Sequence, residues 1–347
     1  MVYFAYTLIG LPYFAWGAEL SNTYDGRSTI TAWREQFMLA GTVVATSLPI
    51  LLTVFEYDAI RQVVFVEAII ICVMMPIVMA LCTAFVPEPR ELRVVRTVTD
   101  FRSRLKIIRR NGPFMRILIG YTGSLIAGAM DGAVSFFFCK HVLNQESWFA
   151  FALLCHLVAA VIGVPIWNAV GKRVGKHRAL VYAIIWYAAW AFCMPLLTID
   201  ATPVWVVVTG FVFLQSMKGL SLGAFDALSA SMAADVVDID VARTGEQRTG
   251  LYFSIWGVVK KFAGAFAAFV ALTGVGIFGF DATANPDDAY TASGNSAGAL
   301  LALTLGYSFL PSMFKLSVLP YLWRYPLTAT RQARIHARIE RLAAERT

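Results

Sequence analysis

SWFAFALLCHLVAAVIGVPIWNAVG, residues 147–171, carries no Asp, Glu, Lys or Arg, and the basic stretch KRVGKHR, residues 172–178, follows it at once. A helix of about 20 mostly apolar residues is long enough to cross the hydrocarbon core of a bilayer. Basic residues directly after such a run are typical of loops on the cytoplasmic side. The stretch therefore predicts a transmembrane helix that ends in the cytoplasm.

The composition of the whole chain agrees with this reading. Of its 347 residues 58% are hydrophobic and only 15% are charged, whereas soluble domains carry about 25% charged residues. The 29 Lys and Arg residues exceed the 22 acidic ones, but they cluster between apolar runs, which favours membrane orientation over nucleic-acid binding. The composition predicts an all-α integral membrane protein that binds no nucleic acid.

Further apolar runs follow the same pattern along the chain, and continuous runs of this length are not the alternating pattern of a β-barrel. We expect nine transmembrane helices, at 1–20, 35–56, 62–86, 113–138, 147–170, 178–199, 202–233, 250–278 and 296–323. Four segments result: a partial N-terminal half of three spans, a basic linker, a C-terminal half of six spans and a basic tail. Their ranges are 1–86, 87–112, 113–323 and 324–347.

Basic residues alternate between the loops. The loops after the odd-numbered spans hold 22 of the 29 Lys and Arg residues, with Arg178 counted at the edge of the sixth span. The positive-inside rule places these loops and the C-terminal tail in the cytoplasm, which puts the N-terminus outside. Since six spans follow the basic linker, a two-halved transporter would have six before it. We therefore expect an odd number of helices to precede Met1 in the complete protein.

Ionisable side chains inside a span are functional candidates, because they are costly unless paired or facing water. Asp226 and Lys218 are eight residues apart on one expected helix and could face one cavity. Lys260 and Lys261 point about 100° apart, so we expect at most one of them to face a central cavity. The remaining candidates are Asp131 as a functional group, Lys315 as a snorkelling residue and His156 as a hydrogen-bonded core residue.

Motifs of enzymes and channels are missing from the sequence. It contains no GxSxG, HExxH or Walker A motif. Its five cysteines form no CxxC pair, and no histidine spacing suits zinc. We expect neither a catalytic activity, nor a metal site, nor an organic cofactor.

Three stretches carry a resemblance to a known family. They are LPYFAWGAEL (residues 11–20) with YDGR (24–27) and AWR (32–34); ADVVD (234–238) continuing to RTGLYF (248–253), Trp256 and Lys261; and YPLT (325–328) before a short basic segment. Together they resemble the glycoside–pentoside–hexuronide cation symporters of the major facilitator superfamily, the family of melibiose permease. The resemblance covers helices four to twelve of that twelve-helix fold.

The resemblance implies a substrate cavity between two helical halves. Arg34 matches an arginine that contacts the sugar, and Lys261 matches a lysine near the cation and sugar sites. Tyr13, Asp226 and Trp256 are further candidates for substrate binding. Gating across the halves is implied for two carboxylates and two nearby basic residues, which are Asp235, Asp238, Arg243 and Arg248.

Three departures from the family pattern bear on substrate and coupling. Gly10 stands where melibiose permease has a carboxylate, Asp226 stands where it has a sugar-facing aromatic residue, and Gly26 replaces a more usual acidic residue. The cation-binding aspartates of the family lie on helices that precede this chain.

These observations predict a secondary transporter that moves a sugar, glycoside or uronide together with Na⁺ or H⁺ by alternating access. We expect a monomer in a bacterial inner membrane, with its C-terminus in the cytoplasm and a small molecule as its ligand. A transporter of the same fold for a non-sugar amphiphile is one alternative. A membrane-embedded sensor or scaffold that transports nothing is the other.

Overall fold

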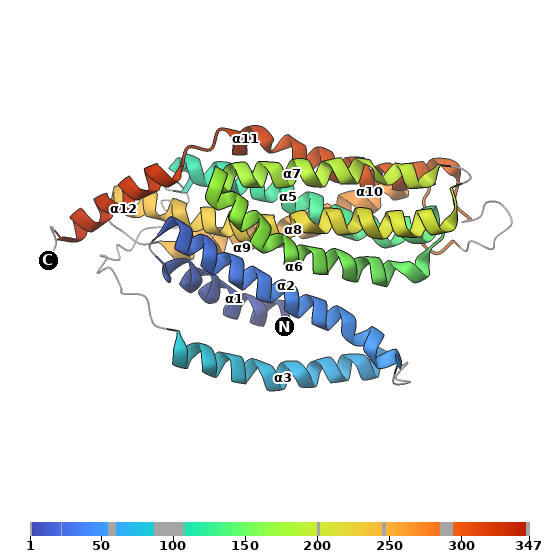
Figure 1. Cartoon of the computed structure of the whole chain (residues 1–347), viewed down its shortest axis with the longest axis horizontal. Coiled ribbons are helices and arrows are strands. Elements are labelled where there is room, and N and C mark those ends of the chain that lie inside the picture. Colours follow the sequence, from blue (N-terminus) through green and yellow to red (C-terminus); the bar gives the residue numbers. More distant parts are fainter. Residues whose placement is uncertain are drawn as a thin grey trace.

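The structure is a computed structural model in which residues 2–21, 23–54, 60–86, 106, 108–199, 202–244, 248–284 and 294–344 are described. This part of the chain is a bundle of long helices and contains no strand (Figure 1). The all-α prediction is therefore confirmed. Most of the expected linker, residues 87–105 and 107, lies outside the described residues.

The helices follow one another in the order of the predicted spans. The first three are α1 (Val2–Glu19), α2 (Tyr24–Val54) and α3 (Ile60–Phe85). The next are α5 (Gly112–Phe137), which continues into a π-helical turn at Phe138–Val142, α6 (Phe149–Val174), α7 (Lys176–Phe192) and α8 (Val204–Thr244). The last are α9 (Thr249–Ile277), α10 (Ala297–Ser317), the short α11 (Leu319–Trp323) and α12 (Ala329–Ala344).

Seven helical segments in the described part are long and apolar enough to cross a membrane, and α3 is the first of them. The other six run from α5 to α11. We keep nine as the predicted number of spans, because α1 and α2 occupy the first two expected positions without being among these seven.

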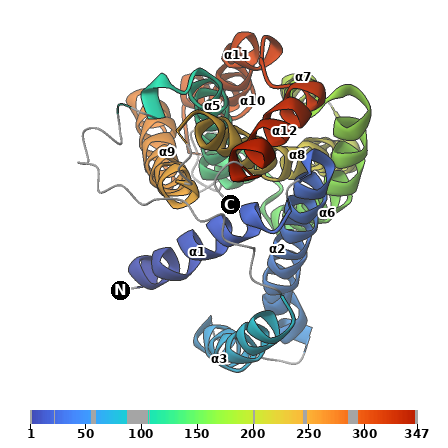
Figure 2. The same ribbon diagram turned by 90° about the vertical axis from the view of Figure 1, so that its left-hand side faces the viewer.

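Helix α8 occupies the centre of the C-terminal part and packs along α6 and α7 (Figures 1 and 2). Gly219 and Gly223 lie one turn apart on the face of α8 that meets α6. A Cβ atom at Gly219 would overlap the carbonyl oxygen of His156, and one at Gly223 would crowd Val164. Small residues at this four-residue spacing let two membrane helices approach closely, so the two glycines fix the position of α8.

Two helices are longer than the apolar runs predict. Helix α2 begins at Tyr24 rather than at residue 35, and α8 continues to Thr244 rather than ending at residue 233. With 41 residues and a rise of about 1.5 Å per residue, α8 is roughly 60 Å long, about twice the thickness of the hydrocarbon core. The helices continue beyond the predicted spans, and several charged residues of these extensions, among them Arg27, Asp235 and Asp238, have partners on other helices.

Helix α3 stands apart from the bundle (Figures 1 and 2). It contacts α2 only at one end, and none of its membrane-spanning window is buried. A helix that is apolar on all sides and uncovered by protein requires an apolar solvent, which here is the bilayer.

Helix α12 follows a short segment after α11 and packs against α8 (Figure 2). Its arginines Arg331, Arg334 and Arg338 are exposed, whereas Gln332 is fully buried. The tail therefore forms an amphipathic basic helix that packs on the bundle through Gln332 and through the partly buried Ile335 and Ile339.

Candidate functional site

A cavity of about 650 Å³ lies between the first two helices and the C-terminal part. Helices α1, α2, α5, α8 and α9 all contribute to its wall. The wall combines apolar and aromatic side chains with five charged groups, which are Arg34, Glu35, Asp226, Lys260 and Lys261. Concave sites with an apolar lining and a few converging polar groups are typical of small-molecule binding.

Arg34 and Glu35 approach the cavity from α2. Glu35 is only 3% exposed, and its Oε1 atom lies 3.4 Å from Nη2 of Arg34. The guanidinium of Arg34 also lies 4.7 Å from the ring centre of Phe14 on α1. It passes close to Gly17, where a Cβ atom would be 3.1 Å from Nη1. Arg34 therefore joins α1, α2 and the cavity.

Asp226 faces the same cavity from α8. The hydroxyl of Tyr121 donates a hydrogen bond of 3.3 Å to Oδ1 of Asp226, and Nζ of Lys260 lies 3.9 Å from the same oxygen. The ring of Tyr121 in turn stacks on Trp256, with 3.9 Å between ring centres. The four side chains form one contiguous part of the wall, made by α5, α8 and α9.

The structure brings four of the five residues predicted for substrate binding and coupling together at this cavity. Arg34, Asp226, Trp256 and Lys261 all line it. Tyr13 does not, since its side chain is 45% exposed beside Phe14 on the outer side of α1. The stacking partner of Trp256 is Tyr121, so one face of the indole is already covered.

The expectation for the adjacent lysines of α9 was wrong. Lys260 and Lys261 both line the cavity, because both side chains are long enough to reach it from either side of the helix.

Lys218 does not share the cavity with Asp226. It is fully buried behind it, where Nζ forms an ion pair of 2.5 Å with Asp131 on α5. Nζ of Lys315 lies 3.4 Å from the ring centre of Tyr187, and the side chain is buried rather than snorkelling. His156 is the hydrogen-bonded core residue that we expected, with Nδ1 2.8 Å from the carbonyl oxygen of Gln215.

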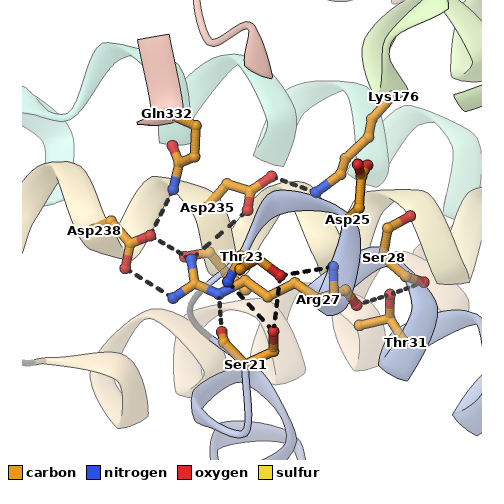
Figure 3. A network of polar contacts seen from close by, with 12 residues as sticks. Ser21, Thr23, Asp25, Arg27, Ser28, Thr31, Lys176, Asp235, Asp238 and Gln332 are labelled. Atoms are coloured by element: carbon orange, nitrogen blue, oxygen red, sulfur yellow. Dashed lines mark hydrogen bonds and ion pairs between the residues drawn. The ribbon is translucent and has the colours of Figure 1, made fainter. Parts of the chain in front are cut away.

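A second polar site, the Arg27 network, joins four helices (Figure 3). Arg27 of α2 forms a bidentate ion pair with Asp238 of α8 and lies 3.7 Å from Asp235. Lys176 at the start of α7 binds Asp235 at 2.6 Å. Gln332 of α12 donates a hydrogen bond of 2.5 Å to Asp238. All five side chains are buried.

Two of the predicted gating residues belong to this network and two do not. Asp235 and Asp238 are at its centre, but Arg248 binds Asp240 at 3.1 Å. Arg243 is exposed beside a different groove, near α12. Arg27 and Lys176 take the expected basic positions instead, because α2 and α7, rather than the following turn, pack beside Asp235 and Asp238.

Two basic residues of the network, Arg27 and Lys176, were not predicted as gating residues, although both lie in stretches quoted above. Arg27 ends the YDGR stretch, and Lys176 lies in the basic loop after residue 171. Glu35 directly follows Arg34 and carried no signal beyond being an acidic residue at the edge of an apolar run.

The Arg27 network lies at the end of the bundle that holds α12, because Gln332 of α12 belongs to it (Figure 3). Along α8 it is nine residues beyond Asp226, which is about 13 Å, and along α2 it is seven residues before Arg34, which is about 10 Å. A direct ion pair therefore joins α2 to α8 on the α12 side of the cavity.

Comparison with known proteins gives one family. The family model described as MFS/sugar transport protein matches residues 1–329. The chain is 24% identical over 193 residues to a sodium-dependent lysophosphatidylcholine symporter 1-A of Danio rerio, covering 55% of this chain and 35% of the relative.

Two relatives come from Escherichia coli (strain K12). A glucuronide carrier protein homolog is 24% identical over 238 residues, which cover 68% of this chain and 49% of the relative. The inner membrane symporter YicJ is 22% identical over 289 residues, with 83% and 61% covered. The chain spans about a third to three fifths of the length of these relatives. On the family match over nearly its whole length, and on its apolar helices, the chain is a multi-pass membrane protein that belongs to the MFS/sugar transport family.

Proposed function

We propose that the protein is a secondary transporter that carries a sugar, glycoside or uronide together with Na⁺ or H⁺ through the cavity between α1–α2 and α8–α9. One observation carries the proposal: helices of both expected halves line the cavity, and an ion-paired network joins α2 to α8 on the α12 side of it. Alternating access needs a substrate site between two bodies and a contact that can open at each end.

The cavity chemistry supports a polar substrate with an apolar part. Arginine forms bidentate hydrogen bonds with carboxylates and with paired hydroxyls, and carboxylates accept hydrogen bonds from sugar hydroxyls. Arg34 and Asp226 supply one group of each kind, while Phe14, Phe253 and Trp256 supply apolar surface. The glucuronide carrier homolog among the relatives supports a uronide as the first substrate to examine.

A non-sugar amphiphile is the second candidate. The lysophosphatidylcholine symporters among the relatives favour it, and so does the largely apolar wall of the cavity. The same positive groups that suit a uronide carboxylate also suit a phosphate. We propose a bacterial inner membrane as the location, since two of the relatives are Escherichia coli symporters.

Transport by the purified full-length protein in proteoliposomes tests the proposal. We expect accumulation of a radiolabelled glucuronide, glucoside or lysophospholipid when a Na⁺ or proton gradient is imposed. The Lys261→Ala variant should lose gradient-driven accumulation, because a positive side chain of the cavity is gone. Lys140→Ala, at a surface ion pair with Glu146, is the matched control and should transport normally. Absence of flux for every probe would leave the sensor or scaffold role instead.

A further inference from the structure

Glu35 is a buried acid that no motif singles out. It is 3% exposed on the cavity wall, and its Oε2 atom has no hydrogen-bond partner among the described residues. A charged carboxylate oxygen that is buried and unpaired costs free energy, whereas the protonated acid does not carry that charge. The position therefore suits a group that takes up and releases a proton.

The charged groups around Glu35 support the interpretation that this residue takes up and releases a proton. Arg34 from its own helix contacts Oε1 at 3.4 Å. Asp226 of α8 lines the same cavity and is held by Tyr121 of α5 and by Lys260 of α9. Lys261 of α9 also lines the cavity, and α1 contributes Gly10 and Phe14. Asp226 has two neighbours that stabilise its charge, whereas Oε2 of Glu35 has no hydrogen-bond partner among the described residues.

A sodium site fits these residues less well than a proton site. Na⁺ prefers several hard oxygen ligands, whereas the cavity wall supplies two carboxylates, those of Glu35 and Asp226. Three cations, Arg34, Lys260 and Lys261, also line the cavity and would repel a further metal cation. A proton needs only a single oxygen with a free lone pair.

Protonation of Glu35 changes what Arg34 can bind. While Glu35 is ionised, its carboxylate neutralises Arg34 and repels an incoming anion. Once Glu35 is neutral, the guanidinium of Arg34 is available to bind another carboxylate or a phosphate. Lys260 and Lys261 add positive charge to the same wall.

We infer that Glu35 takes up the coupling proton and thereby releases Arg34 to bind the anionic group of the substrate. The inference rests on the proposed transport function and narrows it to proton symport of a molecule that bears a carboxylate or a phosphate. The proton enters from the open side of the cavity, binds at Oε2 and leaves after the substrate does, so no other reactant is needed. The neutral acid and the anion favour the same state, which is the requirement for symport.

Two measurements on the full chain in lipid nanodiscs test the inference. The first is an infrared difference spectrum between mildly acidic and mildly alkaline pH, which detects the carbonyl band of a protonated carboxyl group. We expect the band in the wild type, its loss in Glu35→Gln and its retention in Glu146→Gln, a matched change at a surface ion pair. An unchanged band in Glu35→Gln would overturn the inference.

The second measurement is equilibrium dialysis with two matched pairs of probes. 4-Nitrophenyl glucuronide is compared with neutral 4-nitrophenyl glucoside, and lysophosphatidylcholine with neutral monoacylglycerol. At the alkaline end the affinity for the correct anionic probe should fall about tenfold per pH unit, the slope for one linked proton. Its neutral partner should show no such slope, and the pair that responds identifies the anion as carboxylate or phosphate.

Glu35→Gln should bind the anionic probe with no pH slope, since Arg34 is then permanently released. A slope that persists in this variant contradicts the inference. The variant is close in shape to the wild type, and circular dichroism with the Glu35→Asp variant, which keeps the acid, controls for misfolding. If none of the four probes binds, the proposed substrate classes fail, whereas the infrared spectrum still decides whether Glu35 takes up a proton.

Discussion

The C-terminal part, α5 to α11, and the first three helices are both apolar, but they bury that surface differently. The spanning window of α8 is 44% buried, and the helix as a whole carries the charged residues Lys218, Asp226 and Asp235. None of the spanning window of α3 is buried, although that window holds no charged residue except Glu67. A protein folded in water would be expected to bury the apolar helix and to expose the charged residues. In a bilayer the lipid accepts apolar side chains, so polar groups lie inside and small residues hold the helices together.

The comparison indicates which regions of the molecule determine stability and which determine opening and binding. The C-terminal part has its own buried ion pair, Asp131 with Lys218, and continuous apolar clusters. The first two helices join it through apolar contacts, such as those of Ala32 and Leu39, and through charged side chains, Arg27 at the network and Arg34 at the cavity. We expect substitutions in the interior of the C-terminal part to change stability, and substitutions at the network and the cavity to change opening and binding.

The largest effect is expected inside the C-terminal part. Asp131→Asn leaves Lys218 buried without its counterion and should lower the free energy of unfolding by about 3–5 kcal/mol. The double variant Asp131→Leu with Lys218→Leu should recover most of this loss, because no charge remains buried. Thermal unfolding in detergent measures both. Lys140→Met breaks an exposed ion pair and should cost less than about 1 kcal/mol. Equal losses for the two single variants would contradict the comparison.

A smaller effect is expected where the two parts meet. Arg27→Gln removes the bidentate pair with Asp238 and should open the end of the cavity near α12. In a variant without native cysteines, Ala230→Cys should then react about tenfold faster with a membrane-impermeant thiol reagent, which corresponds to about 1.4 kcal/mol. Gln332→Leu removes one hydrogen bond to Asp238 and should give a lesser increase.

Arg243→Gln is the matched control for the cavity-opening experiment. Arg243 was expected in the gate but lies beside another groove, so its replacement should leave the labelling rate of Ala230→Cys unchanged. A faster reaction in Arg243→Gln than in Arg27→Gln would indicate that Arg243, as predicted from the sequence, holds the gate closed and that Arg27 does not.

The smallest effect is expected on α3. Ile71→Ala changes a side chain that is 60% exposed and should shift the free energy of unfolding by no more than about 0.5 kcal/mol. Phe114→Ala, at a fully buried position of α5, should cost about 3–5 kcal/mol. Thermal unfolding compares the two directly. A large loss for Ile71→Ala would show that α3 packs against protein in the membrane, and would weaken the contrast between the two parts.

Much of the fold could be predicted from the sequence, because a membrane-spanning helix needs only a local property. The apolar runs placed the helices, and the basic loops predicted their orientation. The ends of α2 and α8 could not be predicted, since their extensions carry charges whose partners lie on other helices. The glycines that bring α8 against α6 also act through a distant segment.

By itself the sequence determined that the chain is an all-α membrane protein and that its motifs belong to one transporter family. Only the tertiary structure decided which oppositely charged side chains form ion pairs. Asp226 and Lys218 share a helix but serve separate sites, whereas Arg27 and Asp238 are more than 200 positions apart and form one ion pair. Pairing depends on which helices pack together, and packing sums many weak contacts between distant segments, so no local pattern records it.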